Sequence, residues 1–168
     1  SEAETVTLME QSGLPVFVTH LNAPQQTVVG GDLEAMTSLQ PFLSARGVKG
    51  IRLEVAGALH TPLMDEARAT LSRALESERL EPPTTLLLTS AANRYSSEPG
   101  EIRESLSAQL TEPVRYQRMV ERLVRDGMGV LIEAGPRSVL TGLHRRILEG
   151  EACTLLSSAE VSRGFATP

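Results

Sequence analysis

The sequence predicts an α/β fold, and two observations carry this prediction. Apolar residues recur at helical spacing in some segments and at strand spacing in others along most of the 168 residues. From residue 60 onward the expected strands alternate with helices, an order that predicts a largely parallel sheet. Hydrophobic residues make up 40% of the chain but aromatic residues only 3%, and Trp is absent. We therefore expect a sizeable core built from aliphatic side chains.

The first 57 residues are expected to form a small subdomain. In order, the pattern predicts a helix over 2–12, strands over 15–19 and 27–29, a helix from Leu33 to Leu43 and a strand from Ile51 to Val55. Asn22 to Gln26 is typical of a turn, and Asp32 of a helix N-cap. The order αββαβ is that of a ferredoxin-like βαββαβ subdomain whose first strand is missing.

Residues 58–157 are expected to form a second α/β unit. In order, we expect a helix from Leu63 to Leu75, a strand over 85–89 buried on both faces, a helix from Ile102 to Leu110, a helix from Pro113 to Asp126, a buried strand over 130–132, a helix from Val139 to Ile147 and a strand over 154–156. Residues 158–168 are expected to be a frayed tail.

Composition excludes several classes of protein. The net charge of −5 and a pI near 5.3 argue against a nucleic-acid binder. No apolar run approaches the roughly 20 residues that span a bilayer, and the acidic start lacks the apolar region of a signal peptide. The single Cys153 excludes an internal disulfide, and no residues have metal-ligand spacing. We expect a cytoplasmic protein without a metal or a bound cofactor.

The run from Ala58 to Met64 carries the strongest chemical signal. His60 is predicted at a strand-to-helix junction, where an imidazole can point into a cleft. The chain contains no Gly-x-Ser-x-Gly elbow that would supply a nucleophile for it. A base without its nucleophile indicates half of an active site. The alternative is a histidine that caps the helix after Pro62.

Four blocks of the sequence, in order, are Asn22–Gly31, Gly57–Met64, Gln109–Tyr116 and Glu133–Leu143. Together they resemble the malonyl-CoA:acyl carrier protein transacylases and the acyltransferase domains of polyketide synthases. One such block would be a weak signal, but four in series over nearly the whole chain are specific. The resemblance is to the C-terminal half of these proteins, and it implies the C-terminal part of an α/β-hydrolase-like acyltransferase core.

The resemblance also implies parts that this sequence lacks. Family members begin with a larger portion that supplies a Gly-Gln-Gly loop, a Gly-His-Ser-x-Gly nucleophile elbow and an arginine that pairs with the malonyl carboxylate. We therefore expect a fragment that works with an N-terminal acyltransferase portion carrying the serine. The 168-residue chain is predicted to be inactive alone.

Family roles carry over onto four residues. His60 matches the general base that takes the serine proton, and a backbone carbonyl near Gln109 would orient its ring. Gln109 is otherwise a polar residue at a helix C-terminus. Asn22 matches an asparagine that lines the acyl pocket, and an Asx turn before Pro24 is compatible with that role. A bulky residue at the position of Leu59 goes with malonyl and a serine with methylmalonyl, so Leu59 favours malonyl.

The implied function is transfer of a malonyl-type acyl group from coenzyme A to the phosphopantetheine thiol of an acyl carrier protein. Two alternatives remain open: a non-catalytic module that docks a carrier protein, and an acyl hydrolase of the same fold. The basic cluster of Arg46, Lys49 and Arg52 is a candidate contact for an acidic carrier protein, or a solvated surface. His20 is expected to be structural, and His144 to lie on a solvated helix face.

Overall fold

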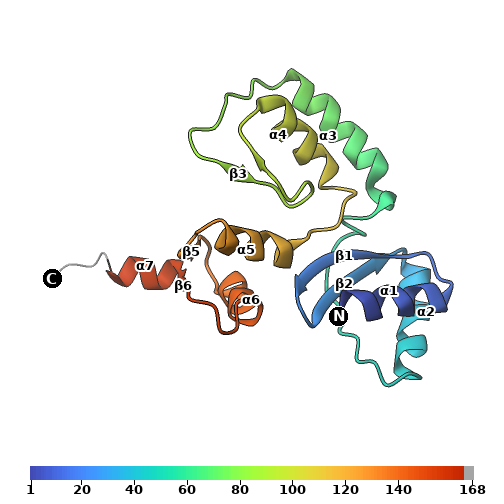
Figure 1. Cartoon of the computed structure of the whole chain (residues 1–168). Helices are drawn as coiled ribbons and strands as arrows, with labels where there is room; N and C mark the ends of the chain where they lie inside the picture. The colour runs from blue at the N-terminus through green and yellow to red at the C-terminus, as the bar shows by residue number, and fades with distance from the viewer. Residues whose placement is uncertain (165–168) are drawn as a thin grey trace.

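The computed structural model describes residues 1–164 as a mixed α/β chain with three separate two-stranded sheets in the described part. The first part consists of α1 (Glu2–Ser12), β1 (Val16–Ala23), β2 (Gln26–Gly31) and α2 (Leu33–Ser44). β1 and β2 form an antiparallel hairpin, with α1 and α2 beside it (Figure 1).

Local signals explain where these helices begin and end. The Ser1 hydroxyl accepts from the Glu4 amide while the Glu4 side chain accepts from the Ser1 backbone, which is a capping box at the start of α1. Gly13 ends α1 in the left-handed region, at φ 63°. The Asp32 carboxylate accepts from the Ala35 amide at 2.7 Å, so the predicted N-cap of α2 is confirmed.

The strand predicted from Ile51 to Val55 does not form. Its three apolar side chains, Ile51, Leu53 and Val55, are 77%, 53% and 66% exposed. No ladder pairs this segment with another strand of residues 1–164. A strand needs a neighbour for its backbone hydrogen bonds, so alternation of apolar residues alone leaves the segment irregular. The αββα order is therefore present, and the closing strand of the expected subdomain is not.

The middle of the chain contains η1 (Pro62–Met64), α3 (Asp65–Ser77), β3 (Leu87–Leu88), β4 (Tyr95–Ser96) and α4 (Pro99–Ala108). Helices α3 and α4 pack against each other (Figure 1). The prediction of a buried strand over 85–89 is wrong, because only Leu87 and Leu88 pair, antiparallel to β4, and Leu86 is 67% exposed.

The last part contains α5 (Tyr116–Arg125), β5 (Val130–Glu133), α6 (Val139–Ile147), β6 (Thr154–Ser157) and α7 (Ser158–Gly164). β5 and β6 pair in parallel, but β3 pairs only with β4, so the largely parallel sheet predicted from residue 60 onward is reduced to these two strands. Buried residues of α5, β5 and the end of α6 form a core of Val120, Leu131 and Leu148. The strand was expected to be buried, but Val130 and Ile132 point outward at 53% and 58% exposure.

Two element boundaries differ from expectation for clear reasons. Helix α5 begins at Tyr116 instead of Pro113, because Val114 bridges to β1 and keeps the chain extended there. The expected frayed tail is helical up to Gly164. At its start, the Glu160 carboxylate accepts from the Ser157 amide and hydroxyl at 2.7 and 2.6 Å. Residues 165–168 of the expected tail lie outside the described residues.

Among the described residues, no helix combines the length and the apolar character needed to cross a bilayer.

Candidate functional site

His60 lies in a turn immediately before η1, with no strand leading into it. Its φ angle of 62° is in the left-handed region, which residues other than glycine seldom adopt. The turn is held by the His60 amide, which donates to the Leu110 carbonyl at 3.0 Å. Strained backbone that surrounding hydrogen bonds enforce is typical of functional positions.

The ring of His60 is tied to the backbone of Gln109. Its Nδ1 lies 2.5 Å from the Gln109 carbonyl oxygen. A carbonyl oxygen only accepts, so Nδ1 carries the proton and Nε2 of the neutral ring keeps its lone pair. Gln109 is also the C-cap residue of α4. The arrangement gives a fixed imidazole with one nitrogen available to take a proton.

The segment from Gln109 to Val114 connects this turn to strand β1. The Leu21 amide donates to the Val114 carbonyl at 2.9 Å, and the Val114 amide donates to the Thr19 carbonyl at 2.8 Å. The same segment therefore holds the backbone and ring of His60 at one end and β1 at the other.

His20 on β1 packs against His60. The two ring centroids are 4.8 Å apart and the rings meet edge to face at 82°. Burial lowers the pKa of His20, and repulsion from His60 lowers it further. The sequence alone does not predict this contact, because the two histidines are 40 positions apart in the chain. The one feature that could have indicated it is the place of His20, just before the block that starts at Asn22.

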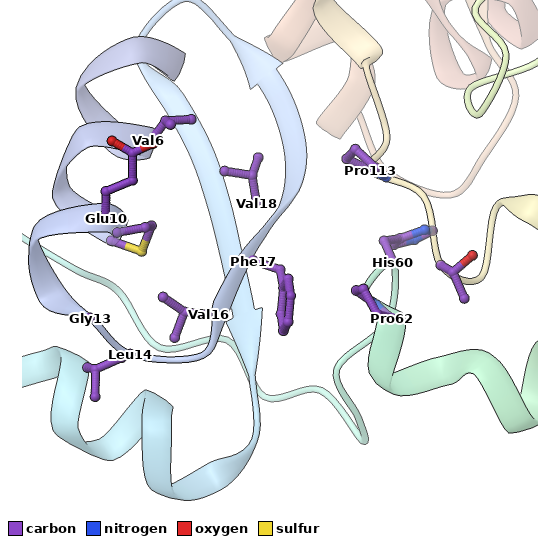
Figure 2. Close-up of a pocket in the computed structure, with 12 residues that line it drawn as sticks. Val6, Glu10, Gly13, Leu14, Val16, Phe17, Val18, His60, Pro62 and Pro113 are labelled. Carbon is purple, nitrogen blue, oxygen red and sulfur yellow. The ribbon is translucent and has the colours of Figure 1, made fainter.

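A groove of about 650 Å³ lies between the α1–β1 side and the His60 turn. Figure 2 shows Val6 and Glu10 of α1 and Phe17 of β1 on one side, with His60, Pro62 and Pro113 on the other. Most of its lining is apolar, so it suits the aliphatic part of a ligand better than a highly charged group.

Of the four predicted site residues, only His60 lines this groove. Asn22 is half-buried in β1, at a bulge where β1 has one residue more than β2. The turn predicted over Asn22 to Gln26 is limited to Pro24 and Gln25. Leu59 is 45% exposed next to His60. Neither is among the described residues that line the groove, so the structure brings together His60 and Gln109 but not all four.

A second polar cluster joins α5, β5 and α6. The buried Glu133 carboxylate accepts from the Leu140 amide at 3.0 Å and from the Thr141 amide and hydroxyl at 2.8 and 2.7 Å. Burial acts to raise the pKa of Glu133, but hydrogen bonds from Thr141, Leu140 and Val139 outweigh it and lower that pKa. Glu133 therefore caps amides at the start of α6 that have no partner within the helix.

His144 belongs to the same cluster, and the expectation that it is solvated is wrong. It is 6% exposed, and its Nε2 lies 2.6 Å from the Tyr116 hydroxyl. Burial lowers the pKa of His144, and burial together with the Glu133 charge raises the pKa of Tyr116 to about 12. Both groups stay neutral near pH 7, which fits a structural role.

Among the described residues, no group of three or more His, Cys, Asp or Glu side chains could hold a metal ion.

Residues 3–162 match the protein family described as the acyl transferase domain. The malonyl CoA-acyl carrier protein transacylase of Haemophilus influenzae is 34% identical over 139 residues, which is 82% of this chain and 45% of that protein. A PKS-NRPS hybrid synthetase of Aspergillus candidus is 29% identical over 86% of this chain and 6% of its own length.

Solved structures agree in fold. The malonyl-CoA:acyl carrier protein transacylase of Xanthomonas oryzae superposes with a TM-score of 0.89 at 27% identity, covering 98% of this chain and 54% of that chain. A malonyl-transacylase in complex with a type II PKS acyl-carrier protein gives a TM-score of 0.81 at 30% identity, covering 90% of this chain and 49% of that one. The chain spans about half the length of the transacylases it matches.

Proposed function

Because the chain belongs to the acyl transferase domain family, we propose that it is the C-terminal portion of an acyltransferase. This enzyme would move a malonyl-type acyl group from coenzyme A to the phosphopantetheine thiol of an acyl carrier protein. The observation that carries the proposal is the 2.5 Å hydrogen bond from His60 Nδ1 to the Gln109 carbonyl. It fixes the ring and leaves Nε2 free to act as a base.

The chemistry follows from that free nitrogen. A serine on the complementary portion attacks the malonyl thioester, and His60 Nε2 takes the hydroxyl proton and returns it to the departing coenzyme A sulfur. The carrier thiol then attacks the acyl-serine, its proton passing through Nε2 to the serine oxygen. A backbone acceptor at Gln109 stabilises the transient imidazolium less than a carboxylate would, but it still orients the ring.

Asn22 and Leu59 complete the proposed acyl pocket. Both sit next to groups of the site in sequence, Asn22 two residues after His20 and Leu59 directly before His60. Leu59 is exposed and Asn22 is half-buried, so both can still be covered by a surface that the complementary portion contributes. Within the proposal, residues 1–57 are the ferredoxin-like small subdomain and 58–157 belong to the α/β-hydrolase-like core.

Exposed apolar surface supports a complementary portion. Val130 and Ile132 project from β5, and the unpaired segment at Ile51–Val55 exposes three large apolar side chains. Apolar groups gathered on a strand face are typical of surfaces that bind another protein element. We propose that the N-terminal acyltransferase portion, with the serine elbow, covers them.

The test is complementation. The 168-residue chain is co-expressed with the N-terminal portion of the Haemophilus influenzae transacylase, and malonyl transfer from malonyl-CoA to holo acyl carrier protein is measured. The complex is expected to transfer malonate and the chain alone is not. His60→Ala in the chain should lower the transfer rate by about 100-fold to 10,000-fold.

Two further readouts separate the alternatives. Arg79→Ala, which changes only an exposed ion pair with Glu81, serves as the control and should leave transfer unchanged. If the complex binds carrier protein and His60→Ala leaves the transfer rate unchanged, the result would favour a docking module. Release of free malonate in place of transfer would favour an acyl hydrolase.

A further inference from the structure

We propose that His20 is a positioning residue for His60. Its ring packs edge to face on the imidazole of His60 and keeps that ring in the orientation whose Nδ1–H bonds to the Gln109 carbonyl. The catalytic consequence rests on the proposed function, but the positioning itself does not.

Contacts to the His60 ring come from two directions. One is the hydrogen bond from Nδ1 to the Gln109 carbonyl at 2.5 Å. The other is the ring of His20, with its centroid at 4.8 Å and an angle of 82°. Rotation about the Cβ–Cγ bond would carry Nδ1 away from this oxygen and break the hydrogen bond. An aromatic ring packed at right angles opposes that rotation, and such pairs are worth about 0.5–1.5 kcal/mol beyond buried area.

The ring of His20 is itself fixed by a hydrogen-bond chain. The Thr19 hydroxyl donates its one hydrogen to the Val28 carbonyl at 3.2 Å. It can therefore only accept from His20, whose Nδ1 lies 3.0 Å away. Nδ1 of His20 thus carries the proton, and its ring orientation is set by the backbone of β2.

The backbone that carries His20 is placed by two neighbours. The β1–β2 register slips by one residue at Thr19, and such a bulge re-aims the side chains beside it. On its other edge, His20 forms a parallel bridge with Val114, in the segment that begins at Gln109. The Gln109–Val114 segment therefore fixes the acceptor of the His60 ring and the strand that carries its neighbour.

His20 suits this role because it remains uncharged. It is half-buried, and a positive charge on it would meet any charge on His60. Burial and the neighbouring His60 both lower the pKa of His20, so the His20 ring is neutral at pH 8.

The tautomer of His60 is the readout, measured by ¹⁵N-resolved imidazole spectra of the 168-residue chain at pH 8. Free histidine favours the Nε2–H tautomer, so a fixed Nδ1–H tautomer is a distinctive signature of the bond to Gln109. In the wild-type chain, His60 should show the Nδ1–H pattern alone. His20→Phe keeps an aromatic ring and should preserve it, whereas His20→Leu should shift the His60 nitrogens towards the averaged tautomer mixture.

The spectra contain their own control. The His144 signals report the bond to Tyr116 and should be identical in all three chains, which shows that the fold persists. A His20→Leu chain whose His60 nitrogens match those of wild type overturns the proposal. So does a His20→Phe chain that loses the Nδ1–H pattern while its His144 signals are unchanged.

Activity in the complemented assembly separates this inference from the proposed function. His20→Leu should lower kcat by about 10-fold to 100-fold with KM for malonyl-CoA unchanged. If His60→Ala leaves transfer intact, the proposed function fails, while the tautomer comparison still decides whether His20 positions His60.

Discussion

Gly30 of β2 faces Thr19 of β1 so closely that a Cβ on Gly30 would stand 2.9 Å from the Thr19 methyl carbon. The same position is 3.7 Å from the methyl group of Thr61, which is fully buried beside His60. The hairpin and the His60 turn are therefore packed together through three small residues. The Thr19 hydroxyl that binds His20 belongs to this contact.

Gly30→Ala is expected to destabilise the chain by about 1–3 kcal/mol, because the added methyl group forces Thr19 away from its bond to the Val28 carbonyl. Urea denaturation measures the free energy of unfolding. Gly57→Ala is the matched control, since nothing lies within 4 Å of its Cβ position. Equal stability of the two variants would show that the Gly30 contact has no energetic weight.

Glu133→Gln is expected to lower the melting temperature most strongly at neutral pH. The carboxylate accepts three hydrogen bonds, whereas an amide presents an NH₂ group to some of those donors. Because the folded state lowers the pKa of Glu133 below its ordinary 4.5, the stabilisation is complete above that value. It is lost as the pH falls through the lower pKa of the folded state.

Melting curves between pH 7 and pH 3 test this linkage. The difference in melting temperature between wild type and Glu133→Gln should shrink as the pH falls below 4.5. The exposed Glu149→Gln should show no such difference at any pH. A gap that stays constant over the whole range would contradict the lowered pKa.

Tyr116→Phe should lower the free energy of unfolding by about 1–3 kcal/mol, because it removes the hydrogen-bond partner of a buried imidazole. His144 Nδ1 already has no hydrogen-bond partner among the described residues, so the variant leaves both ring nitrogens unpaired. In a His144→Leu background, Tyr116→Phe should cost less. Denaturant titration of wild type, Tyr116→Phe, His144→Leu and the double variant gives a double-mutant cycle. If the losses in free energy of unfolding of the two single variants simply add in the double variant, the bond has no measurable energy.

Leu59→Ser tests the proposed acyl selectivity in the complemented assembly. A smaller side chain beside His60 should shift the ratio of kcat/KM for methylmalonyl-CoA over malonyl-CoA upward by about 10-fold to 100-fold. Leu63→Ser, which changes another exposed leucine, in η1, is the control and should leave the ratio unchanged. No shift at Leu59 would remove this residue from the acyl pocket.

The parts of the fold that depend on local chemistry could be predicted from the sequence. Asp32 caps α2 as expected, since a side-chain acceptor and three following amides suffice for that signal. The parallel pairing of β5 and β6 also follows from the helix between them. The strand predicted from Ile51 to Val55 depends on long-range pairing and does not form. Its apolar spacing is that of a strand, but a strand forms only beside a partner strand.

The candidate site shows the same difference between features that local sequence predicts and features that depend on long-range contacts. The bond between His60 and Gln109 could be expected because both residues lie in blocks with a known arrangement. His20 could not, because its contact with His60 depends on a one-residue bulge in β1 and on the bridge to Val114. Neither feature leaves a periodic signal in the sequence.

The Gln109–Val114 segment also determines how the site opens. The amides of His60, Leu21 and Val114 all take part in hydrogen bonds made by this one segment. All three hydrogen bonds break when the segment separates from its neighbours, so the three amide protons are expected to exchange with deuterium at a common rate. The two histidines therefore sit in a single cooperative unit, and local unfolding removes the pair together instead of loosening one ring at a time.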